Sequence, residues 1–179
     1  MSDWREDLKA ALHSGRADYM KAMLARVPAD VLQQVLPSIS ALAATFEQKG
    51  ELEQALIYRD QLVEFDPDSS NPWAERAALQ LRRGDLDAAL ADARRLAEVA
   101  PNDPRAPRMQ GEVHAARGEV DQARSAYIAA LALSPDDPAL QEALARLSSP
   151  ELPPAPPLPE VVFDPAVFGE TLPRVGSDD

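Results

Sequence analysis

Two histidines, His13 and His114, are the side chains best suited to move protons near neutral pH in this chain. They stand far apart in the sequence. Neither belongs to a nucleophile elbow, a phosphate loop, a zinc-binding H-E-x-x-H pair or a dinucleotide fingerprint. Cysteine is absent, which excludes disulfides, thiol catalysis and cysteine-bound metals. The residue types therefore predict a chain that is not an enzyme and has no catalytic residue, metal or cofactor.

The charge distribution argues against several classes of partner. The net charge is -12, and residues 36–69 and 138–179 each carry two positive and seven negative charges, or -5. Phosphate backbones repel such a chain, so we expect no nucleic acid. The charged N-terminus does not resemble a signal peptide, and no apolar run reaches the about 18 residues of a membrane span. We expect a cytoplasmic protein without a membrane or small-molecule partner.

The elements that must position any functional group follow a repeat. Gly50, Gly84 and Gly118 are spaced 34 residues apart. The same step relates three further sets, which are Ala43, Ala77 and Gly111; Ala55, Ala89 and Ala123; and Pro67, Pro101 and Pro135. A period of this length indicates an array of helical units. The units run over residues 36–69, 70–103 and 104–137.

Each repeated residue has a physical reason. Leu42, Ala43 and Phe46 show the helical spacing of apolar residues that opens each unit. The repeated glycine ends this first helix, because glycine adopts a positive φ at little energetic cost. The small residues let the two helices of a unit approach closely. The proline ends the second helix, and an Asn-Pro or Asp-Pro pair such as Asp137-Pro138 then begins the next one.

Over residues 36–137 the chain resembles the tetratricopeptide repeat family. The second unit carries most of the signature, with Trp73, Ala77, Gly84, Asp85, Ala89, Leu96 and Pro101. The resemblance implies an all-α fold, a right-handed superhelix (α-solenoid) of three helical hairpins. We expect residues 1–35 to form a degenerate helical cap and residues 138–148 a capping helix. Residues 149–179 form a Pro-rich acidic tail that we expect to be disordered.

Three departures from the family pattern stand out. Arg76 and Gln110 occupy a position that is usually leucine. Pro107 falls in the first turn of its predicted helix, where it would cost a hydrogen bond and loosen the start of the third unit. His114 stands where the family has an aromatic residue, so we expect it to pack between helices.

The resemblance also implies where a partner would bind. In this family the first helix of each unit lines the concave groove of the superhelix. The positions that correspond to this groove are Ser40, Ala44, Glu47, Asn71, Ala74, Ala78, Leu81, Arg82, Arg105, Arg108 and Glu112. They predict a floor of small residues flanked by Arg82, Arg105 and Arg108, which would suit an acidic peptide or helix. Helix propensity alone also explains the alanines.

Some members of the family hold a partner's C-terminal carboxylate with four polar or basic residues of the groove. The corresponding residues here are Ser40, Ala44, Arg108 and Glu112, of which only Arg108 is basic. The sequence therefore argues against this carboxylate clamp.

The tail carries a second candidate binding element. Apolar residues cluster in a segment that is too short to form a core of its own, namely Val161, Val162, Phe163, Val167 and Phe168. The cluster is either an incidental sticky segment or a linear motif that docks on another protein or on this chain's groove.

These features predict a non-catalytic interaction module, an adaptor, scaffold or chaperone that binds a peptide or helix of another protein through the groove, the tail or both. The size and architecture resemble those of small secretion chaperones. The alternative is a recruiting region or accessory subunit of a larger enzyme, such as a glycosyl-, sulfo- or methyltransferase.

Overall fold

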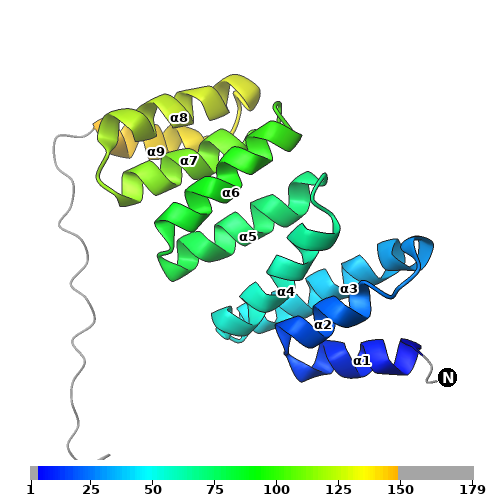
Figure 1. Ribbon diagram of the computed structural model, residues 1–179. Coiled ribbons are helices and arrows are strands. Elements are labelled where there is room, and N and C mark those ends of the chain that lie inside the picture. Colours follow the sequence, from blue (N-terminus) through cyan, green and yellow to red (C-terminus); the bar gives the residue numbers. More distant parts are fainter. Residues whose placement is uncertain (1–3, 149–179) are drawn as a thin grey trace, which may run out of the picture. The chain divides into compact units, whose positions relative to one another are not determined.

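The computed structural model describes residues 4–148, which fold as successive antiparallel helices (Figure 1). The described range contains no strand, and its helices are α1 (Trp4–Ser14), α2 (Ala17–Leu24), α3 (Ala29–Gln48), α4 (Leu52–Phe65), α5 (Ser70–Arg83), α6 (Leu86–Val99), α7 (Arg105–Ala116), α8 (Val120–Leu133) and α9 (Pro138–Ser148). Each helix from α3 onward packs on the next one along the chain. The predicted all-α repeat fold is therefore confirmed.

The repeated glycines and prolines lie where the helices end. Gly50, Gly84 and Gly118 have φ values of 78°, 83° and 74°, in the left-handed region that disfavours any side chain. The second helix of each unit ends two residues before its proline, as α4 does at Phe65 before Pro67. The 34-residue pattern was therefore a correct guide to the turns.

The repeated small residues lie where the helices of a hairpin touch. Ala43 and Ala77 are completely buried. A Cβ atom added to Gly111 would lie 2.7 Å from the ring of Tyr127, which packs across it from α8. Only glycine therefore fits beneath that ring in the third hairpin.

The helix α3 differs from the prediction. It begins at Ala29 and continues through Pro37, so the expected boundary between residues 35 and 36 lies inside a helix. Val31, Leu32 and Val35 have the helical apolar spacing and pack on the core formed with α1, α2 and α4. Their burial outweighs the hydrogen bond that Pro37 cannot donate. The N-terminal cap therefore consists of α1 and α2, and residues 29–35 extend the first unit.

Two predicted helix starts also need correction. Asn71 and Pro72 lie inside the first turn of α5, which begins at Ser70 and therefore ahead of the expected cap. Pro107 lies in the first turn of α7, where a backbone N–H would have no helical partner, so the expected hydrogen-bond cost is not incurred. The start of α9 agrees with the prediction, because Asp137 Oδ1 accepts a hydrogen bond from the backbone N–H of Ala139 at 2.9 Å.

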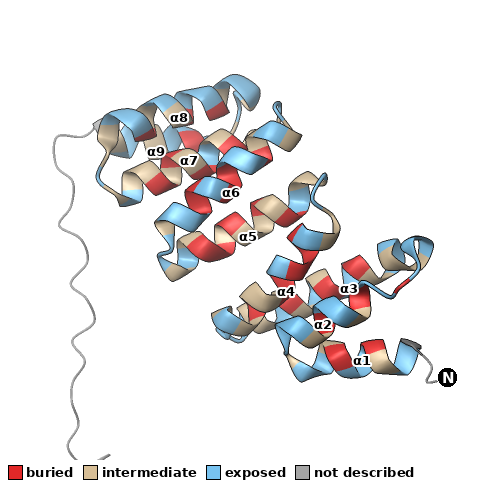
Figure 2. Ribbon diagram, viewed as in Figure 1, coloured by how far each residue is buried: buried red, intermediate tan, exposed pale blue. Residues whose placement is uncertain are grey.

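The core changes in character along the array. Around α1 to α4 it contains large side chains such as Met20, Leu24, Ile39 and Tyr58. Between α5 and α7 it consists mostly of alanines around Leu96. In Figure 2 the buried residues follow the inner faces of the helices. The N-terminal helices are therefore separated by bulky residues, whereas the later ones approach closely.

Candidate partner-binding surface

The predicted groove residues divide into exposed and buried groups. Ala74 is 2% exposed and belongs to the core between α5 and α7, so it does not line an open floor. Ala78 and Leu81 are half-buried and pack against the same core. The remaining predicted residues are exposed or half-buried, and they are Ser40, Ala44, Glu47, Asn71, Arg82, Arg105, Arg108 and Glu112. The alanines of α5 therefore belong to helix packing rather than to a free groove.

A buried arginine joins the first helices of two units. Arg59 of α4 is 5% exposed. Its Nε and Nη2 donate to Glu47 Oε1 of α3 at 2.9 and 2.7 Å. Its Nη1 donates to Ser40 Oγ at 3.1 Å and to Glu75 Oε2 of α5. This guanidinium therefore ties α3, α4 and α5 together beneath the predicted groove.

All three arginines of the predicted basic flank have carboxylate partners. Arg82 pairs with Glu47 of the preceding unit at 3.0 Å. Arg105 pairs with Asp103 at 2.6 Å, and Arg108 pairs with Glu112 at 2.9 Å. Hydrogen bonds from the Arg105 side chain hold the pKa of Asp103 below its ordinary range. The flank is therefore less positive than its arginines alone suggest.

The position where Arg76 replaces leucine holds an ion pair instead of an apolar contact. Arg76 Nε and Nη2 each donate to one oxygen of Asp92 at 2.7 Å, and Asp92 is 4% exposed. Asp60 accepts from the same guanidinium at 2.9 Å, and the ring of Trp73 lies 5.2 Å from it. Burial opposes the charge on Arg76, but the hydrogen bonds to Asp92 and Asp60 raise its pKa. This departure from the family pattern therefore has a structural role.

A polar hollow of about 230 Å³ opens between α3 and α5. It brings together Ser40 and Asn71, two residues placed in the groove from sequence. Ser40 donates to Glu75 Oε2 at 3.3 Å at its wall, and Leu36 and Leu62 supply its apolar lining. Part of the predicted groove is thus present here, although polar contacts cross it.

An apolar hollow of about 300 Å³ opens between α1 and α3, and the sequence analysis did not predict it. Leu8 and Leu12 of α1 line it together with Val31 and Val35 of α3. The exposed residues Arg5, Lys9 and Ser38 complete its lining. The apolar spacing of Val31 and Val35 was the available signal, but it was hidden by the assumption that the unit begins at residue 36.

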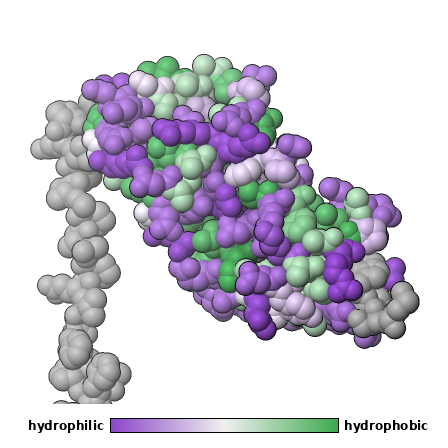
Figure 3. All heavy atoms as spheres, in the orientation of Figure 1, coloured by the Kyte–Doolittle hydropathy of each residue, from purple (hydrophilic) through white to green (hydrophobic). Residues whose placement is uncertain are grey.

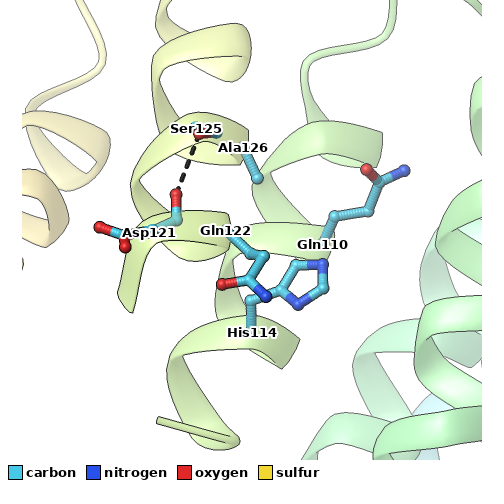
Figure 4. Close-up of a pocket in the computed structure, with 6 residues that line it drawn as sticks. All are labelled: Gln110, His114, Asp121, Gln122, Ser125 and Ala126. Carbon is cyan, nitrogen blue, oxygen red and sulfur yellow. Dashed lines mark hydrogen bonds between the residues drawn. The ribbon is translucent and has the colours of Figure 1, made fainter. Parts of the chain in front are cut away.

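The predicted environment of His114 is partly correct. Its side chain is 20% exposed, and its Nδ1 lies 2.5 Å from Glu119 Oε2. It also lines an open hollow between α7 and α8 (Figure 4). There Ser125 Oγ donates to the backbone carbonyl of Asp121 at 2.9 Å, and Figure 4 shows Ser125 directed away from the imidazole. His114 and Ser125 therefore do not form a base–nucleophile pair in this structure.

Some predictions concern residues that the structure does not describe. The apolar segment with Val161, Val162, Phe163, Val167 and Phe168 lies outside residues 4–148. Within the described range no helix has the length and apolar character needed to cross a membrane. Among the same residues no cluster of histidine and carboxylate side chains could hold a metal ion.

Comparison with known proteins identifies one repeat directly. The family model described as tetratricopeptide repeat matches residues 108–147, which cover most of α7, all of α8 and nearly all of α9. No curated protein matches the chain. The second tetratricopeptide domain of human RPAP3, solved with an HSP70 peptide, is 17% identical with a TM-score of 0.61, and the match covers 65% of this chain and 98% of that one.

Two bacterial chaperone structures have a higher sequence identity. The Yersinia enterocolitica type III secretion chaperone SycD, in complex with a peptide of the translocator YopD, is 25% identical with a TM-score of 0.57, covering 64% of this chain and 88% of that one. PcrH, in complex with the chaperone binding region of PopD, is 26% identical with a TM-score of 0.55, covering 68% and 88%. The family model thus identifies a tetratricopeptide repeat at residues 108–147, and the solved tetratricopeptide domains share the helical-repeat fold of this chain.

Proposed function

We propose that this protein is a non-catalytic interaction module that binds a peptide or helical segment of another protein, as an adaptor or chaperone. The observation that carries the proposal is the open apolar hollow between α1 and α3. Support comes from SycD and PcrH, which are solved with segments of the translocators YopD and PopD.

The lining of the hollow defines the chemistry of the segment. Leu8, Leu12, Val31 and Val35 surround an apolar space of about 300 Å³ that suits a large aliphatic or aromatic side chain. Such a side chain, the anchor of the segment, contributes about 25 cal/mol of binding free energy for each Å² of apolar surface that it buries. Lys9 lies on the exposed side of the lining and favours an acidic residue beside the anchor. The segment is therefore apolar with acidic neighbours.

The predicted groove residues lie apart from this hollow, and none of them lines it. Ser40 and Asn71 line the polar hollow between α3 and α5, which shares no lining residue with the apolar hollow and is a separate surface. The four positions of the carboxylate clamp are occupied by Ser40, Ala44, Arg108 and Glu112, and Arg108 is engaged by Glu112. A C-terminal carboxylate is therefore not the feature that this surface recognises.

The proposal is tested by filling the apolar hollow. The full chain would be used to select binders from a displayed library of random peptides, and the affinity of one selected peptide would be measured by fluorescence anisotropy. Ser38→Trp places an indole at the lining of the hollow without replacing a core residue. We expect the selected peptides to share an aromatic or large aliphatic residue next to an acidic one, and Ser38→Trp to weaken binding at least about tenfold, or about 1.4 kcal/mol.

Ala41→Trp is the matched control, because Ala41 is exposed on α3 and does not line the hollow. It should bind the selected peptide like the unaltered chain. If the library yields no binder, or if the two tryptophan variants weaken binding equally, the proposed surface is wrong.

A further inference from the structure

The outer face of α8 carries an apolar stripe. Ile128 and Leu133 are 55% and 41% exposed and are the exposed large hydrophobic residues of the described range. Ala129 and Ala132 are exposed between them, at helical spacing. In Figure 3, where α8 lies along the top of the view, green and pale green atoms appear there beside purple ones. The stripe faces away from Ala123, Tyr127 and Ala130, which α8 contributes to the core.

This stripe is not a property of the repeat. One period earlier, α6 carries Arg94, Arg95 and Glu98 at the positions that correspond to Ile128, Ala129 and Ala132, and all three are exposed. In α4 two of the same positions carry the exposed residues Asp60 and Glu64. At the position of Leu133 the earlier units carry Val99 and Phe65, which are apolar and half-buried. The outer face is therefore charged at the positions of Ile128 and Ala132 in the first two units and apolar there in the third. Burying apolar surface is favourable, so the third unit is suited to a contact that the other two do not make.

We propose that a second copy of this chain covers the stripe, with the two α8 helices packed antiparallel about a two-fold axis. Such an interface must be self-complementary. An axis that passes between residues 130 and 131 places Ile128 opposite Leu133 of the other copy and Ala129 opposite Ala132. Large residues then contact each other at both ends, and the alanines between them allow the helix axes to approach to about 8 Å.

Charge at the ends of the stripe favours the same arrangement. The axis places Arg124, whose side chain is 41% exposed, opposite the turn of the other copy that holds Asp136 and Asp137. Among residues 4–148 Arg124 has a 3.4 Å contact with Asp121 and a 3.2 Å hydrogen bond to the carbonyl of Leu147. Two symmetric pairs of opposite charge would therefore flank the apolar centre, which agrees with the usual arrangement of an apolar centre within a polar rim.

The size of the stripe predicts a weak dimer. A stable interface buries about 800 Å² on each partner, and two large side chains with two alanines over two helical turns supply less than this. Association should therefore depend on concentration and reverse on dilution. It uses α8, whereas the proposed peptide site uses α1 and α3, so either proposal can fail without the other.

Sedimentation velocity of the full chain from about 1 μM to about 1 mM tests the proposal. The unaltered chain should shift from monomer toward dimer over this range. Ile128→Glu should remain monomeric at the highest concentration, whereas Arg94→Glu, at the corresponding position of α6, should behave like the unaltered chain. Circular dichroism should show the same helix content for all three, because both replaced residues are exposed.

A charge exchange tests the antiparallel register. Arg124→Glu should weaken the dimer at least about threefold, and the double variant with Asp136→Arg should restore it, because the opposite charges then face each other again. A monomer at every concentration overturns the proposal. So does a dimer that survives Ile128→Glu, or an Arg124→Glu variant that Asp136→Arg does not rescue.

Discussion

The junction between α1 and α3 and the junction between α3 and α5 differ in what fills them. Between α1 and α3, leucine and valine side chains surround an open apolar hollow with Lys9 at its exposed side. Between α3 and α5, Arg59 and Arg82 bind Glu47, and Arg59 also reaches Glu75. One junction therefore keeps apolar surface accessible, whereas charged side chains cross the other.

The difference shows that resemblance to a family does not by itself locate a ligand. The groove positions of the tetratricopeptide family lead to α3, α5 and α7, where several of the side chains already bind each other. The open apolar surface arises instead because α3 begins at Ala29, earlier than a standard first helix. Its added turns carry Val31 and Val35 to the wall shared with α1.

The largest expected effect on stability concerns the ion pairs between α3 and α5. Arg59→Leu would leave Glu47, whose side chain is 19% exposed, without its closest partner. Removing one member of a buried charge network costs about 3 kcal/mol. We expect a loss of this size in the free energy of unfolding, measured by urea denaturation.

Arg82→Leu is the comparison for that variant. Arg82 binds the same Glu47, but its side chain is 50% exposed, and an exposed pair contributes less than about 1 kcal/mol. Equal losses from the two variants would show that burial of Arg59 does not determine the strength of this junction.

A smaller effect is expected from the close approach of α7 and α8. Gly111→Ala would place a Cβ atom 2.7 Å from the ring of Tyr127. We expect a net loss of about 1 to 2 kcal/mol in thermal or urea unfolding, because overpacking exceeds the gain in helix propensity. In a Tyr127→Ala background the same substitution should cost nothing. Ala77 and Ala93 already occupy the corresponding positions of the second unit and are both completely buried. If Gly111→Ala still lowers the stability in the Tyr127→Ala background, the ring of Tyr127 is not the cause of the loss.

The smallest expected effect concerns the Arg105–Asp103 pair and the dependence of stability on pH. Hydrogen bonds from Arg105 lower the pKa of Asp103 from its ordinary value of 3.8. A lowered pKa contributes stability above the ordinary value, and this contribution is lost as the pH falls through the lowered value. Arg105→Gln should therefore raise the pKa of Asp103, measured by NMR titration. It should reduce stability near neutral pH but not under strongly acidic conditions. An unchanged pKa would contradict the pairing.

Much of the fold could be predicted from residue types alone. The glycines required a positive φ, and the prolines ended second helices, so the turns followed from local chemistry. The small residues marked the contacts between paired helices because any larger side chain would separate them. The start of α3 was missed because the 34-residue period set the beginning of the first unit at residue 36. The helix begins earlier because Val31, Leu32 and Val35 pack on the core.

The sequence by itself determined the period and the hairpins, since each follows from which residue occupies a given position. Only the tertiary structure decided which groove side chains remain available. Ala74 is buried because α7 packs on α5, and Arg82 is engaged because Glu47 lies within reach on the neighbouring unit. Such contacts join residues about one repeat apart, and their distances depend on how closely the helices pack. The apolar hollow and the outer stripe of α8 belong to the same class, because burial is a property of the assembled helices.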